Sequence, residues 1–102
     1  MEKILKSRGM SIKEPLRELA EEKLGTLEKF DPNLTECEVE FISEKNPQRG
    51  DESFKVHFRA HSKHGVQRIE AVGGNPEAAF YDGFDRLRRV IRKQREKATE
   101  HR

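Results

Sequence analysis

The stretch Asn75–Lys97 reads NPEAAFYDGFDRLRRVIRKQREK and predicts the helix against which the rest of the chain must pack. Asn75 is a good capping residue, and Pro76 suits the first helical position. Apolar residues then recur at helical spacing, so one side of the helix must be buried: Phe80, Phe84, Leu87 and Ile91. From Arg86 onward the remaining surface is basic, with Glu96 the single acidic residue before Lys97.

The basic side chains of this helix fall into two groups around its apolar side. One group forms a stripe, with Arg92 beside it, and consists of Arg86, Arg89, Lys93 and Lys97. Arg88 and Arg95 lie on the other flank. A solvated helix normally interleaves acidic residues that support it through i,i+4 pairs, but none occurs between Arg86 and Arg95. The basic side chains therefore repel one another and lower the stability of the helix. This cost favours a surface that binds polyphosphate over one that is merely solvated.

Length and composition indicate one small domain, residues 1–97, followed by a short polar tail, residues 98–102. The net charge of +2 conceals an asymmetry, since residues 1–51 carry −3 and residues 52–102 carry +5. A charged fraction of 39% leaves disorder as an alternative, which the strong periodicity of the apolar residues disfavours. With one cysteine, no membrane-spanning run and no signal peptide, we expect a cytoplasmic protein without a membrane partner.

The residues before Asn75 predict a strand, a helix and three further strands. Residues 3–8 form the first strand. A helix follows between Ser11 and Asp31, and Ser11 with Glu14 matches a capping box. Its apolar face consists of Ile12, Leu16, Leu19, Ala20, Leu24 and Leu27. The three strands cover Cys37–Phe41, Phe54–Ala60 and Val66–Val72, and the first two of them alternate polar and apolar residues. A polar loop, Lys45–Asp51, and a hairpin turn, Lys63–Gly65, separate them.

The predicted fold is therefore α+β in the order β-α-β-β-β-α. Each helix has one apolar side, and the strand alternation gives the sheet one apolar face. Both helices are expected on that face of a four-stranded mixed sheet, an arrangement similar to double-stranded-RNA-binding domains. The first two strands would be parallel, and the last three would form an antiparallel meander.

Candidate catalytic and metal-binding residues have simpler structural explanations. His57 and His61 share a strand face but lie about 13 Å apart, too far to hold one metal ion. Cys37 alternates inward, and no motif places a base beside it. Gly73-Gly74 before the last helix lacks the pattern of a phosphate-binding loop. We expect no enzyme, no metal and no cofactor.

The order of elements and the basic last helix resemble the short forms of bacterial ribosome hibernation-promoting factors and ribosome-associated inhibitors. The resemblance covers essentially the whole chain and depends on spread positions rather than on one motif. These positions are Ser7–Met10, Leu16–Arg17, Lys23–Lys29, Gly65, Asn75–Ala79 and Leu87–Lys93.

This resemblance implies a factor that binds the small ribosomal subunit and its rRNA in the decoding channel and inhibits translation in starved or stationary cells. Its target could be single ribosomes or ribosome dimers, while the protein itself is expected to be a monomer without a DNA partner. The implied RNA-binding residues are Arg86, Arg89, Arg92, Lys93 and Lys97 on the last helix, and Lys23 and Lys29 on the first. Relatives often carry Lys where this chain has Thr26, so a smaller contribution from the first helix is expected.

Two other functions fit the same pattern. Helices on one face of a three-stranded meander also suit a general binder of double-stranded RNA, although the additional first strand counts against it. Alternatively, the basic helix could dock an acidic protein partner.

Overall fold

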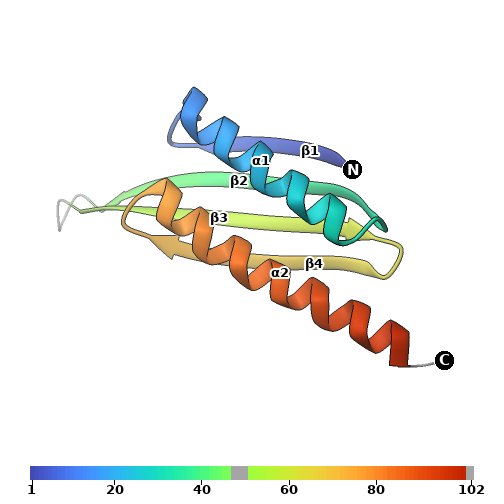
Figure 1. The fold of residues 1–102 in the computed structure, drawn as a ribbon. Coiled ribbons are helices and arrows are strands. Elements are labelled where there is room, and N and C mark those ends of the chain that lie inside the picture. The colour runs from blue at the N-terminus through green and yellow to red at the C-terminus, as the bar shows by residue number, and fades with distance from the viewer. Residues whose placement is uncertain (47–50, 101–102) are drawn as a thin grey trace.

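The computed structural model describes the backbone of residues 1–46 and 51–100, and its elements follow the predicted order (Figure 1). The elements are β1 (Glu2–Arg8), α1 (Glu14–Phe30), β2 (Leu34–Asn46), β3 (Asp51–Ser62), β4 (Gly65–Gly73) and α2 (Pro76–Glu100). Strand order in the sheet is β1-β2-β3-β4, with β1 parallel to β2 and the other neighbours antiparallel. The predicted α+β fold is confirmed.

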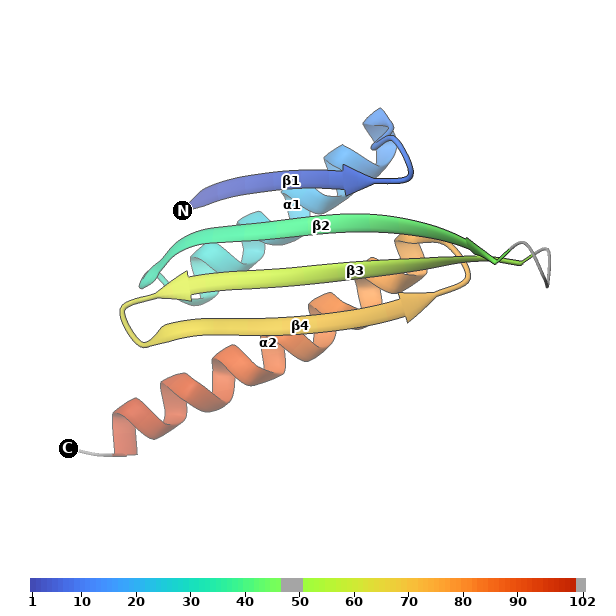
Figure 2. The same cartoon turned by 180° about the vertical axis from the view of Figure 1, so that it is seen from behind.

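Both helices cover one face of the sheet, and the opposite face is left uncovered by helices (Figures 1 and 2). α1 contacts β1 and β2, whereas α2 contacts β3 and β4. The two helices run in the same general direction, and the C-terminal part of α2 extends past the end of the sheet (Figure 1). The sheet face opposite the helices is called the open face below.

The core forms between the helices and the inward residues of the strands. Cys37, Val39 and Phe41 of β2 lie opposite Ala60, Phe58 and Val56 of β3, and all six are buried. The apolar side of α2 packs on this surface and is buried as predicted at Phe80, Phe84, Leu87 and Ile91. From α1, the buried residues are Leu16, Ala20, Leu24 and Leu27, while Ile12 and Leu19 are partly buried against the same core.

The predicted cap of α2 is confirmed, but that of α1 is wrong. Asn75 Oδ1 accepts a hydrogen bond from the backbone N–H of Ala78 at 2.7 Å. In α1 the N-cap is Lys13, with no side-chain cap, and the helix begins at Glu14 rather than directly after Ser11. A start at Ser11 would place Pro15 where its backbone nitrogen should donate to the Ser11 carbonyl, which proline cannot do.

The turns define the ends of the strands. Lys63 and His64 form the tight turn between β3 and β4, and Gly65 follows with φ +116°. The strands around the predicted loop Lys45–Asp51 are longer than expected, because Asn46 pairs with Asp51. Backbone pairing therefore extends the two strands into residues whose polar composition predicted a loop. The centre of that predicted loop lies outside the described residues.

Close packing of α2 against β3 gives Gly83 a structural role. A Cβ atom at Gly83 would lie 2.4 Å from Cε2 of Phe58 and 3.1 Å from Cβ of Ala71. We expect Gly83→Ala to lower the free energy of unfolding by up to about 2 kcal/mol, because overpacking costs about 1–3 kcal/mol and the gain in helix propensity returns about 1 kcal/mol.

Gly25 in α1 is the matched control. A Cβ atom there would meet, within 4 Å, the terminal nitrogen of Lys3 at 3.6 Å, a flexible group that can move. Gly25→Ala should therefore raise the free energy of unfolding by up to about 1 kcal/mol. Urea denaturation measures both variants, and a gain in stability at Gly83 would contradict the packing described here.

Candidate nucleic-acid interface

The basic half of α2 lies beside the C-terminal end of α1. Arg95 of α2 donates a hydrogen bond to the backbone carbonyl of Phe30, the last residue of α1. Its guanidinium carbon also lies 5.5 Å from the centroid of the Phe30 ring. All seven basic residues between Arg86 and Lys97 are exposed. The exposed cations therefore belong to α2, whose basic half lies next to the end of α1 and whose C-terminal part extends past the sheet (Figure 1).

Most of the α2 cations have no acidic partner among the described residues. Arg86, by contrast, pairs with Asp82 at 3.3 Å and donates to the backbone carbonyl of Glu70 in β4. Among the described residues, no carboxylate lies within ion-pair distance of Arg88, Arg89, Arg92, Lys93 or Lys97. These charges are available to an external anion, whereas Arg86 also anchors α2 to the sheet.

The two predicted residues of α1 lie in different surroundings. The Lys23 ammonium lies 5.8 Å from the ring centroid of Tyr81 in α2, so Lys23 faces the second helix. Lys29 lines a separate hollow together with Lys3 and three acidic residues, Glu21, Glu22 and Glu28. The structure thus places Lys23 beside α2 and Lys29 among acidic side chains.

Arg88 lies close to the C-terminal end of α1. Together with Arg92 it lines a hollow whose other wall consists of Thr26 and Phe30. Spacing of three to four residues from Arg88 through Arg92 to Arg95 indicates that these side chains share one side of α2. The sequence could not show that this side faces α1, because the lateral placement of two helices on a sheet depends on tertiary packing.

Acidic residues gather at the opposite end of the helical face. Both helices begin at the same end of the sheet, and the first residues of each line one hollow that includes Pro15 and Glu77. The N-terminal halves of the helices carry, before Arg86, one basic residue, Arg17, and seven acidic residues: Glu14, Glu18, Glu21, Glu22, Glu77, Asp82 and Asp85. The helical face is therefore polarised, and a polyanion would meet repulsion at this end and attraction at the other.

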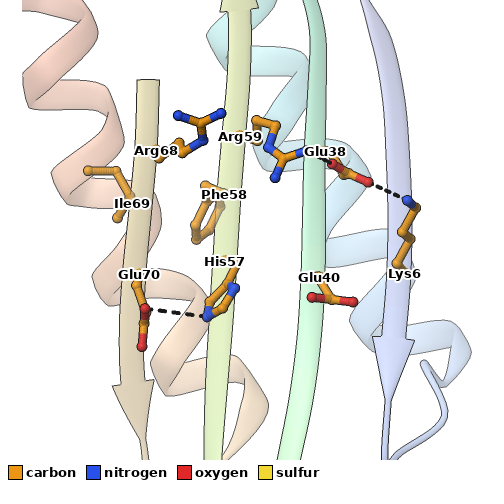
Figure 3. A pocket seen from close by; sticks show the side chains of 9 residues that line it. All are labelled: Lys6, Glu38, Glu40, His57, Phe58, Arg59, Arg68, Ile69 and Glu70. Atoms are coloured by element: carbon orange, nitrogen blue, oxygen red, sulfur yellow. Dashed lines mark hydrogen bonds and ion pairs between the residues drawn. The ribbon is translucent and has the colours of Figure 1, made fainter. Parts of the chain in front are cut away.

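The open face carries charges of both signs that pair with each other. A hollow of about 540 Å³ lies on it (Figure 3). Glu38 accepts from Lys6 at 2.6 Å and from Arg59 at 3.4 Å, and the hydrogen bond from Lys6 lowers the pKa of the Glu38 carboxyl. His57 lies 3.5 Å from Glu70. Such pairing leaves no cationic stripe of the kind found on α2.

The strand register places acidic residues opposite basic or histidine residues on this face. Glu38 lies opposite Arg59, and Glu40 lies opposite His57. Lys55 lies opposite Ile42, and its ammonium reaches Glu44 at 3.5 Å. Phe58 is 1% exposed, so its ring provides no platform for stacking bases on the open face.

The two histidines of β3 that share a strand face lie beside carboxylates. His57 and His61 each face a separate carboxylate, Glu70 and Glu36, at 3.5 Å. Within residues 1–46 and 51–100, no group of three His, Cys, Asp or Glu side chains could hold a metal ion. No helix in this same part of the chain is long and apolar enough to cross a membrane.

Comparison with known proteins identifies a matching family and solved structures with a similar fold. Residues 4–99 match a protein family described as "Sigma 54 modulation protein / S30EA ribosomal protein". A ribosomal subunit interface protein from Coxiella burnetii is similar with a TM-score of 0.69 and 19% identity, over 98% of this chain and 99% of that protein's chain. The N-terminal domain of Thermus thermophilus Protein Y also gives 0.69 and 19%, over 91% and 98%. No curated protein matches the chain significantly.

The buried thiol of Cys37 gives a test of the closed core beneath the helices. Burial raises the pKa of Cys37 to about 12, so about one thiol in ten thousand is ionised at pH 8. An exposed cysteine would be about one quarter ionised at that pH. We expect iodoacetamide to leave the folded protein essentially unmodified and to alkylate it rapidly in urea, as measured by mass spectrometry. Rapid labelling without urea would contradict the burial of Cys37.

Proposed function

This chain belongs to the family of sigma 54 modulation proteins and S30EA ribosomal proteins, and we propose that it is a non-enzymatic factor that binds the small ribosomal subunit through rRNA phosphates. The proposal extends to binding in the decoding channel and inhibition of translation during starvation or stationary phase. Its family supports the association with ribosomes, and the solved structures it resembles include a protein named for the ribosomal subunit interface.

The observation that carries the proposal is the exposed cationic surface of α2. Five of its basic side chains lack a carboxylate partner among the described residues, although repulsion between them destabilises the isolated helix. Phosphates of a nucleic acid would neutralise this charge and release the counterions condensed on the RNA. The open face, whose charges are largely paired within the protein, offers no comparable surface.

The charge distribution on the helical face also favours rRNA within a folded particle over a long RNA duplex. The helical face is cationic at one end and acidic at the other, so a long uniform duplex laid along both helices would meet repulsion over part of its length. A particle that presents phosphates to the projecting end of α2 avoids this repulsion. We therefore place the main contact at Arg88, Arg89, Arg92, Lys93 and Lys97, with Lys23 as a second contact from α1.

Charge reversal on α2 tests the assignment. In the triple variant Arg89→Glu, Arg92→Glu, Lys93→Glu, attraction to phosphate becomes repulsion, and we expect affinity for small subunits to fall roughly 100-fold or more. Arg86 is left unchanged because it contacts β4. Binding is measured by co-sedimentation with purified small subunits, and circular dichroism verifies that the variant is folded.

A control variant with the same change in net charge separates local contact from overall charge. Arg8→Glu, Lys45→Glu, Arg68→Glu alters three exposed residues that belong to the sheet. This variant should sediment with small subunits nearly as well as the native chain. If a folded α2 variant retained native binding, the proposed interface would be wrong.

Salt dependence provides an independent measure of the contact. With about five phosphate contacts, the affinity should fall by roughly two to three orders of magnitude between 50 and 200 mM salt. Titration of small subunits at several salt concentrations gives the slope directly. A slope near zero would exclude a mainly electrostatic contact.

The same assays distinguish the alternative functions. Equal affinity for a plain RNA duplex and for small subunits would favour a general double-stranded-RNA binder. Association that survives nuclease treatment of an extract would indicate an acidic protein partner. The position of the protein on a ribosome gradient from starved cells tests the proposed link to starvation.

A further inference from the structure

A small hollow between the two helices combines cationic and aromatic groups. Its walls consist of Thr26 and Phe30 from α1 and of Arg88 and Arg92 from α2, and its volume is about 210 Å³. This volume lies below the range of about 300–1,000 Å³ that is typical of pockets for drug-sized ligands. The hollow therefore suits a group the size of a single nucleobase better than a larger molecule.

Each wall of the hollow offers groups that nucleotides bind. Arg88 and Arg92 have no carboxylate within ion-pair distance among the described residues, so their planar guanidinium groups are available to an incoming ligand. Bases that leave a helical stack are held against aromatic rings or arginine planes, and both are present here. Thr26 donates its hydroxyl hydrogen to the Lys23 carbonyl at 2.6 Å, which leaves its oxygen free to accept from a base.

The position of Phe30 is fixed from outside the hollow. Arg95 contacts both the carbonyl and the ring of Phe30, and this double contact joins the ends of the two helices. The Asp31 backbone N–H donates to the Leu27 carbonyl at 2.8 Å and completes the last turn of α1. A ring held in this way is preorganised, so binding a base costs little ordering of the protein.

We propose that this hollow binds one unpaired nucleotide of an RNA strand whose neighbouring phosphates lie on the cationic surface of α2. The inference rests on the proposed RNA-binding function and adds the recognition of an extruded base to it. Arg89 and Lys93 lie within one helical turn of Arg92 and would hold the phosphates on either side. A free mononucleotide would use the hollow alone and forgo these contacts.

Binding to two matched RNA hairpins tests the proposal. One hairpin has a fully paired stem, and the other has the same stem with a single bulged adenosine. Fluorescence anisotropy with labelled RNA should show that the native chain binds the bulged hairpin roughly tenfold more tightly, since stacking of one base gives about this preference. Equal affinity for the two hairpins would overturn the inference.

Variants that keep the charge isolate the planar groups. Arg88→Lys combined with Arg92→Lys retains both positive charges but removes the guanidinium planes. We expect this variant to bind the paired hairpin within about twofold of the native chain and to lose the preference for the bulge. Phe30→Leu should reduce the preference in the same way. Arg68→Lys, which alters an exposed arginine on the open face of the sheet, is the matched control and should retain it.

The remaining outcomes separate failure of this inference from failure of the proposed function. Preference for the bulge that survives in the double lysine variant would overturn the assignment of the hollow. Displacement of the bulged RNA by AMP at concentrations near the dissociation constant of the RNA would assign the hollow to free nucleotides and overturn the inference. If the chain binds small subunits without preferring the bulge, this inference alone fails. If it binds neither small subunits nor either hairpin, the proposed function fails with it.

Discussion

Burial of the Phe80 ring fixes the orientation of α2, and the other surfaces of the protein depend on that orientation. The ring lies 5.4 Å from the centroid of Phe58 in β3, 6.0 Å from Phe41 in β2 and 5.9 Å from Phe84 in its own helix. Each buried aromatic ring contributes about 1.5–3 kcal/mol, so rotating α2 about its axis would lose several such contributions. Once the apolar side of α2 is fixed on the sheet, its basic residues lie toward solvent, toward α1 or, for Arg86, toward the edge strand β4.

A helix whose C-terminal half is this basic needs support that does not come from acidic neighbours. The structure supplies it through polar contacts with other elements. Arg86 donates to the Glu70 carbonyl, Gln94 contacts Gln67 and the His64 carbonyl at 3.1 Å each, and Arg95 joins Phe30. These contacts hold α2 without neutralising its charge. The surface therefore remains cationic while the helix remains in place.

Much of the fold follows from local sequence patterns, because alternation in the strands and helical spacing at Phe80 to Ile91 each indicate which side must be buried. The cap at Asn75 was equally predictable from the residue type. The start of α1 was mispredicted, because the capping box at Ser11 competes with Pro15 and the proline prevails. Among site residues, the exposure of the basic side chains of α2 follows from helical geometry alone. Proximity of Arg88 to Phe30 depends on how two helices lie side by side, which periodicity within one helix cannot specify. The acidic residues around Lys29 belong to α1 itself, so the sequence of that one helix already contains them.

The contacts between α2 and β4 have a consequence for how this protein meets other chains. β4 is an edge strand, and an edge strand with unpaired backbone groups can pair with a strand of another molecule. Arg86 and Gln94 donate to carbonyls of this strand and of the turn before it, so side chains of α2 occupy part of that edge. The opposite edge, β1, is short and carries Lys3, Lys6 and Arg8. Intermolecular strand addition and aggregation are thereby disfavoured at both edges, which suits a protein that carries a four-stranded sheet with one face uncovered by helices.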